Sequence, residues 1–182
     1  MDATTALDRT DRLMAGLIDQ LTADDRTAQT PCTEWTVDDL LEHVCQGGQM
    51  VAGGLRGQAP PDDAPDVLAD GPAAGWKQTV AALRDAATPD VLTATHQMPF
   101  GEVSGEKALA VIIADHATHA WDLAQATGLA FSIDDDLAEY VFDTFKAVVP
   151  AEDRQWGFDP VVPVPDDAAL LDRLIGYTGR RP

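Results

Sequence analysis

Apolar side chains recur every three to four residues along most of this chain, which is the spacing of amphipathic helices. The pattern predicts helices over residues 4–21, 36–54, 73–87 and 105–127, another from residue 133 onward, and a last one over 166–177. Local signals mark several helix ends. Residues 36–39 resemble a capping box with Asp39 in place of Glu, Ser132 is a typical N-cap, and Gly128 is a typical glycine beyond a helix C-terminus.

The segments between these ranges are rich in turn-forming residues. Residues 23–34 and 57–71 are predicted loops, and the second contains many Pro, Asp and Ala residues. Residues 91–103 predict either a short hairpin or an irregular connection, and prolines extend residues 158–165. Long helices with one strand-like interruption indicate a mainly all-α fold, a helical bundle with a C-terminal helix, in a single domain over residues 1–182.

The helix predicted over 105–127 carries ionisable side chains in an apolar stripe. At about 100° per residue, Asp115, His119 and Asp122 fall on one face among alanine, valine, isoleucine and leucine. Such groups are costly to bury unless they are paired or bind a metal. His43 lies beside apolar positions on the helix that begins at Thr36. Two imidazoles and one carboxylate suit zinc or another divalent first-row metal and leave coordination positions open.

Alternatives remain for each member of this set. The histidines are equally explained as buried groups that hydrogen bonds satisfy, with Asp115 as one acceptor. Asp122, one turn beyond His119, either orients a metal-bound imidazole or makes an interhelical hydrogen bond. His116, rotated about 100° from Asp115, is expected at the flank of the stripe, where it supports a metal-ligating side chain, faces a substrate or is simply exposed.

The composition of the chain limits the classes of partner and the cellular compartment that are expected. The chain has 31 acidic and 12 basic residues and a net charge of −19, which argues against binding to nucleic acid or to an anionic membrane. A polar N-terminus without a secretory signal and only two cysteines favour a reduced, cytoplasmic setting. Cys32 and Cys45 match no zinc-ligand spacing and are interpreted as ordinary thiols. Trp35 is expected to pack against the helix that follows it.

Two motifs resemble a known family. Residues 30–44 (TPCTEWTVDDLLEHV) are similar to the opening motif of the mycothiol-dependent maleylpyruvate isomerase N-terminal domain, a member of the DinB-like superfamily, and residues 115–128 (DHATHAWDLAQATG) resemble its second metal motif. The closing residues 163–182 are similar to an uncharacterised actinobacterial branch of that group. The resemblance implies a DinB-like four-helix bundle that holds one divalent metal through His43, Asp115 and His119. Asp115 stands where the isomerase has Glu.

The same resemblance implies a function. Related proteins are thiol-dependent transferases, so the first hypothesis is a cytoplasmic metalloenzyme that uses a mycothiol-like thiol and an electrophilic substrate for S-transfer or isomerisation. Zn²⁺ is the expected ion, with Ni²⁺, Mn²⁺ and Fe²⁺ as alternatives. A non-catalytic metal- or ligand-binding module and a metal-dependent hydrolase are the competing hypotheses. A homodimer through an exposed helix face is also compatible with a bundle of this size.

Overall fold

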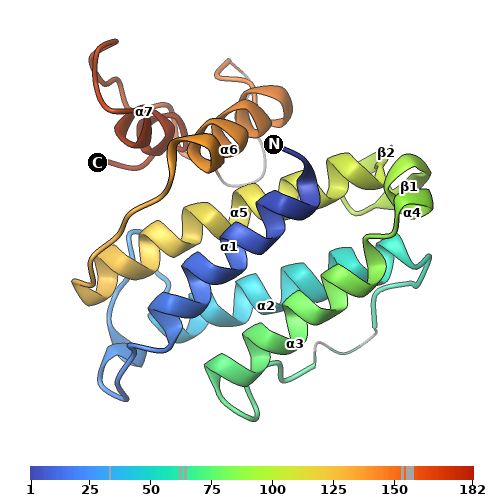
Figure 1. The fold of residues 1–182 in the computed structure, drawn as a ribbon. Helices are drawn as coiled ribbons and strands as arrows, with labels where there is room; N and C mark the ends of the chain where they lie inside the picture. The colour runs from blue at the N-terminus through green and yellow to red at the C-terminus, as the bar shows by residue number, and fades with distance from the viewer. Residues whose placement is uncertain (33, 62, 64, 153, 155–157) are drawn as a thin grey trace.

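The computed structural model describes residues 1–182 except residues 33, 62, 64, 153 and 155–157. Most of the described chain is helical (Figure 1). The elements are α1 (Ala3–Ile18), the 3-10 helix η1 (Asp25–Thr27), α2 (Val37–Leu55), α3 (Pro72–Ala86), α4 (Pro89–Thr93), β1 (Thr95–Met98), β2 (Gly101–Ser104), α5 (Gly105–Thr127), α6 (Asp135–Val148) and α7 (Leu170–Tyr177). The prediction of a mainly all-α fold is therefore confirmed.

The four long helices α1, α2, α3 and α5 form the bundle. Helix α5 packs against α1 and α2, and α3 packs against the same two helices from the other side. Figure 1 shows α1 and α5 lying alongside each other above α2 and α3. Buried apolar residues from all four helices fill the interior, among them Met14, Leu40, Leu83 and Leu109. None of the helices in the described ranges is long and apolar enough to cross a membrane.

Two of the predicted end signals fix the helices that matter for the site. Helix α2 begins with the predicted capping box: the Thr36 amide donates to the Asp39 carboxylate at 2.8 Å, and the Asp39 amide donates to the Thr36 hydroxyl at 3.3 Å. Helix α5 ends at Gly128, whose φ of 69° lies in the left-handed region that glycine adopts without strain. These ends fix the positions of His43 on α2 and of His119 on α5.

The structure decides one open alternative and changes two predicted helix starts. Of the two alternatives for residues 91–103, the short hairpin is confirmed: after the end of α4, β1 and β2 pair in an antiparallel hairpin in which Thr95 lies opposite Ser104. Helix α6 is capped by Asp134 rather than Ser132, because the Asp134 carboxylate accepts the Leu137 amide at 3.0 Å. Helix α7 begins at Leu170 and not near Asp166, since residues 166–168 form a turn.

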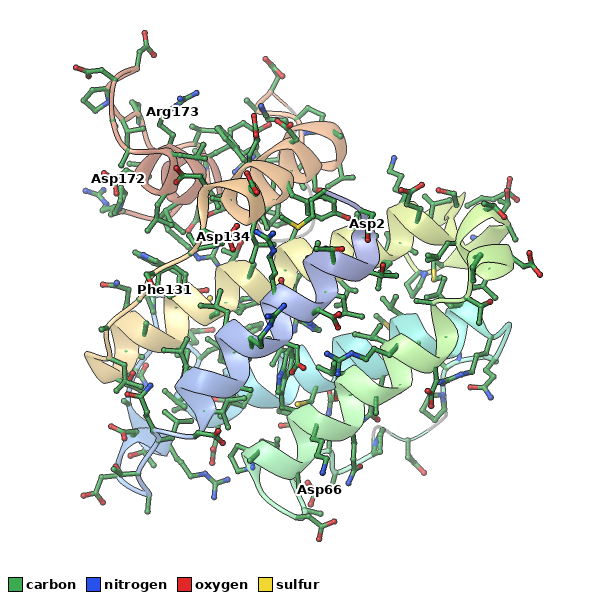
Figure 2. All side chains as sticks on the ribbon, viewed as in Figure 1. Asp2, Asp66, Phe131, Asp134, Asp172 and Arg173 are labelled. Carbon is green, nitrogen blue, oxygen red and sulfur yellow. The ribbon has the colours of Figure 1, made fainter. Side chains whose placement is uncertain are left out.

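Helices α6 and α7 cover one side of the bundle. Helix α6 packs against α5 and α1, and α7 packs against α6. In Figure 2, Asp134 at the start of α6 lies over α1, where Arg9 donates to its carboxylate. The chain beyond α7 then returns to α5, so the C-terminal segment can contribute to a site on that helix.

Candidate metal centre

Helices α2 and α5 bring His43, Asp115 and His119 together. Nε2 of His43 lies 3.5 Å from Oδ2 of Asp115, and Nε2 of His119 lies 3.5 Å from Oδ1 of the same carboxylate. The three side chains each offer one ligand atom, and these atoms all lie within 4.8 Å of one another. Asp115 and His119 project from the same face because they are one turn apart on α5.

The geometry of this trio fits a divalent ion better than a set of hydrogen bonds. Two ligands bound at the usual zinc distances with a tetrahedral angle lie about 3.4 Å apart, close to the observed 3.5 Å separations. Hydrogen bonds of this type are usually shorter than 3.2 Å. In addition, Oδ2 of Asp115 is buried and has no hydrogen-bond partner among the described residues. A buried carboxylate oxygen without a partner is costly, and an ion would satisfy it.

The charges of the trio are strongly coupled. Burial alone would raise the pKa of Asp115, but the neighbouring imidazoles of His119 and His43 outweigh burial and hold this pKa well below its usual range. Burial alone would lower the pKa of His119, but Asp115, Asp122 and Cys32 outweigh it and hold this pKa well above its usual value. The surroundings thus stabilise the ionised form of Asp115 when a positive charge lies beside it. A divalent cation bound to the trio would supply such a charge.

Asp122 orients the His119 ring. The side chain of Asp122 is fully buried, and its Oδ2 accepts a hydrogen bond from Nδ1 of His119 at 2.9 Å. This bond holds a proton on Nδ1 and turns Nε2 towards Asp115, so an ion bound between them would displace the Nε2 proton and take that nitrogen as a ligand. The guanidinium of Arg180 donates to both oxygens of Asp122, at 2.6 Å each, which keeps that carboxylate charged.

Cys32 lies on the far side of the His119 ring from Asp115. Its Sγ is 3.4 Å from Oδ2 of Asp122, 3.9 Å from Nδ1 of His119 and 3.5 Å from Nη2 of Arg180. Cys32, His119 and Asp122 therefore form a second group with metal-ligand spacing. The guanidinium of Arg180 already neutralises this group and would repel a cation, so the second group is better suited to supporting His119 than to binding an ion.

His116 is not on an exposed flank, which corrects one expectation from the sequence. Its side chain is fully buried, its Nε2 donates to the Val44 carbonyl at 2.9 Å, and its ring packs edge-on against Trp76. Burial lowers the pKa of His116 to about 4, so the ring is neutral near pH 7. These contacts place it in the interior between α2 and α3 and do not support a role beside the substrate.

Three side chains contribute to the site without having been predicted from the sequence. Trp35 lies with its ring centroid 4.7 Å from that of His43 and 5.8 Å from that of His119, so it covers the ligands as well as preceding α2. Cys32 and Arg180 reach Asp122 from opposite ends of the chain. The position of Cys32 and Trp35 within the same motif as His43 was the one available signal. Arg180 offered none, because nothing local distinguishes it from Arg181.

Comparison with known proteins shows which family the chain resembles. The family model described as the mycothiol maleylpyruvate isomerase N-terminal domain matches residues 7–124, which include His43, Asp115, His119 and Asp122 but not Arg180. Two proteins from two strains of Mycobacterium tuberculosis, both named as uncharacterised, are each 34% identical to this chain over 182 residues. The aligned regions cover 99% of this chain and 98% of each relative. No solved structure matches the chain.

Proposed function

Because this chain belongs to the mycothiol maleylpyruvate isomerase N-terminal domain family, we propose that it is a divalent-metal-dependent enzyme that uses a low-molecular-weight thiol such as mycothiol. The proposed reaction class is S-transfer to an electrophile or thiol-assisted isomerisation. The observation that carries the proposal is the trio of His43, Asp115 and His119, whose ligand atoms converge while Oδ2 of Asp115 is buried without a partner.

The donor set supports zinc as the first choice of ion. Two neutral imidazoles and one carboxylate are ligands that zinc binds in catalytic sites, and nickel, manganese and ferrous iron accept the same set. When bound there, such an ion supplies a Lewis acid that retains net positive charge and lowers the pKa of a coordinated thiol.

The two histidines of the trio differ in how far solvent reaches them. His119 and its partner Asp122 are buried and fix the inner side of the centre, whereas the His43 side chain is 40% exposed and marks the side that solvent reaches. A small molecule can therefore approach from the side of His43. The ring of Trp35 lies beside both imidazoles, so it offers an apolar surface to an organic substrate and limits access of water.

The first test is the metal content of the untagged protein. We expect about one equivalent of divalent metal per chain in the parent and almost none in His43→Ala or Asp115→Ala. His96→Ala is the matched control, because His96 lies on the β1–β2 hairpin and contacts the Val91 carbonyl rather than the trio. A parent that takes up no metal after reloading with zinc, nickel and manganese would contradict the proposal.

The second test asks whether a thiol reaches the ion. Cobalt(II) is loaded in place of the native metal and mycothiol is added; a sulfur-to-cobalt charge-transfer band in the near ultraviolet is the expected result. The Cys32→Ser variant should give the same band, which excludes the protein's own nearby thiol as its source. A cobalt protein that shows no band with mycothiol or glutathione would favour a hydrolase if it cleaves ester or amide substrates, and a non-catalytic binding module if it does not.

A further inference from the structure

We propose that Arg180, which lies outside the range that the family model matches, is a positioning residue of the metal centre and couples the C-terminal segment to metal binding. This inference rests on the proposed metal site. Arg180 touches neither His43 nor Asp115 through a hydrogen bond; it acts through Asp122, which in turn holds the imidazole of His119.

The contact between Arg180 and Asp122 is well suited to holding a side chain in one orientation. Nε of Arg180 donates to Oδ1 of Asp122 and Nη2 donates to Oδ2, both at 2.6 Å, which is the two-pronged geometry of a guanidinium and a carboxylate. The Asp122 side chain is 0% exposed and that of Arg180 is 14% exposed, so water screens this pair little.

The Asp122 carboxylate has no freedom left for another arrangement. Its Oδ2 also accepts from Nδ1 of His119 at 2.9 Å and from the Cys32 thiol at 3.4 Å. If Arg180 is removed, a buried carboxylate loses its compensating charge and two donors, and it must protonate, rotate or draw in water. Each of these responses weakens the bond that directs Nε2 of His119 towards Asp115.

The backbone that carries Arg180 is fixed by the end of α7. The Arg180 amide donates to the Ile175 carbonyl at 3.2 Å and the Gly179 amide donates to the Gly176 carbonyl at 3.1 Å, which is the pattern of a Schellman motif. Gly179 has a φ of 91°, and a Cβ at this position would lie 2.8 Å from the backbone oxygen of Asp159. Glycine is thus required for the turn that directs Arg180 back to α5.

Such an arrangement makes metal binding and seating of the C-terminal segment mutually dependent. An ion bound through Nε2 of His119 favours the ring orientation that Asp122 and Arg180 hold, so it also favours the docked position of the segment. By linkage, a docked segment raises the affinity for the ion by the same factor.

The test compares zinc affinity in three full-length proteins by competition with a chromogenic chelator. Arg180→Gln should bind zinc about 10- to 100-fold more weakly than the parent, the usual effect of losing a group that supports a metal ligand. Arg181→Gln, at the exposed neighbouring position, should bind like the parent. Arg180→Lys should recover part of the affinity, because lysine restores the charge but not the planar fork.

A purely structural role for Arg180 predicts a different result. The melting temperature of Arg180→Gln would then fall while the zinc affinity of its folded fraction stayed equal to that of the parent, and this would overturn the inference. A parent that binds no zinc would instead overturn the proposed metal site, and the inference with it.

A measurement on the parent alone covers the case in which Arg180→Gln does not fold. Zinc should slow hydrogen exchange at the amides of Gly179 and Arg180, which close the turn after α7. Exchange at these amides that zinc leaves unchanged, in a parent that binds zinc, would also overturn the inference.

Discussion

Acidification should destabilise this protein through the buried imidazole of His116. The ring is 0% exposed, donates one hydrogen bond to the Val44 carbonyl at 2.9 Å and has no partner for Nδ1 among the described residues. It also packs against Trp76, with 4.9 Å between ring centroids. A proton added to Nδ1 would therefore enter an apolar environment that cannot solvate it.

The size of the effect follows from the two pKa values of this ring. Burial lowers the pKa of His116 from 6.5 to about 4 in the folded protein, whereas the unfolded chain keeps the ordinary value. As the pH falls below the ordinary value, the unfolded state takes up the proton first, so the free energy of unfolding decreases until the folded pKa is reached. At pH 5, about 1.5 pH units below the unfolded pKa, His116 should cost about 2 kcal/mol.

The assay is urea unfolding of the parent and of His116→Gln at about pH 7.5 and about pH 5, with a chelator present so that metal occupancy does not contribute. Gln retains a donor for the Val44 carbonyl but does not titrate. The difference between the proteins at pH 7.5 reports altered packing. The loss of stability between the two pH values should be about 2 kcal/mol smaller in the variant. Equal losses in both proteins would show that protonation of His116 does not cause the loss of stability at low pH.

Three further predictions concern packing, capping and thiol reactivity. Gly48→Ala should lower the free energy of unfolding in urea by about 1–3 kcal/mol, because its Cβ would lie 2.3 Å from the buried Thr79 methyl. Gly16→Ala on α1, where a Cβ meets nothing within 4 Å, should instead raise the free energy of unfolding by about 0.5–1 kcal/mol. Similar urea midpoints for both variants would contradict this pair. Thr36→Ala removes the capping box of α2 and should cost about 1 kcal/mol in thermal unfolding, while a loss below a few tenths would show that the cap contributes little. Cys45 is 1% exposed and burial raises its pKa to about 11, so Cys32→Ser should show no fast reaction with a thiol reagent until it is unfolded; prompt labelling of the native variant would mean that Cys45 is accessible.

Local sequence signals determined the helices and the metal-ligand candidates. Apolar spacing identified the bundle helices to within a few residues at each end, since a helix that packs on a core must present one apolar face to it. The capping box at Thr36 and the glycine at position 128 correctly predicted helix ends, because a cap depends only on residues within one turn of it. Asp115 and His119 share a face through their spacing alone.

Predictions from local sequence were wrong where contacts with other helices determine the burial of a side chain or the start of a helix. His116 was expected at a flank because it is rotated from Asp115. Helix α5, however, is covered by α1, α2 and α6. A position rotated by about 100° from Asp115 on this helix therefore still faces a neighbouring helix, and His116 is buried. The N-cap of α6 is Asp134 and not the predicted Ser132. The Asp134 carboxylate accepts hydrogen bonds from Arg9 of α1 and from the Leu137 amide of its own helix.

The hydrogen bonds around Asp122 are the clearest case of tertiary structure adding what the sequence could not. Arg180 and Cys32 are 148 positions apart, yet both lie against one carboxylate on α5. Periodicity can report which residues share a face of one helix, because that relation depends on the helical repeat. Which residues from distant segments meet that face depends on how the helices and the C-terminal turn pack, and only the folded chain defines it.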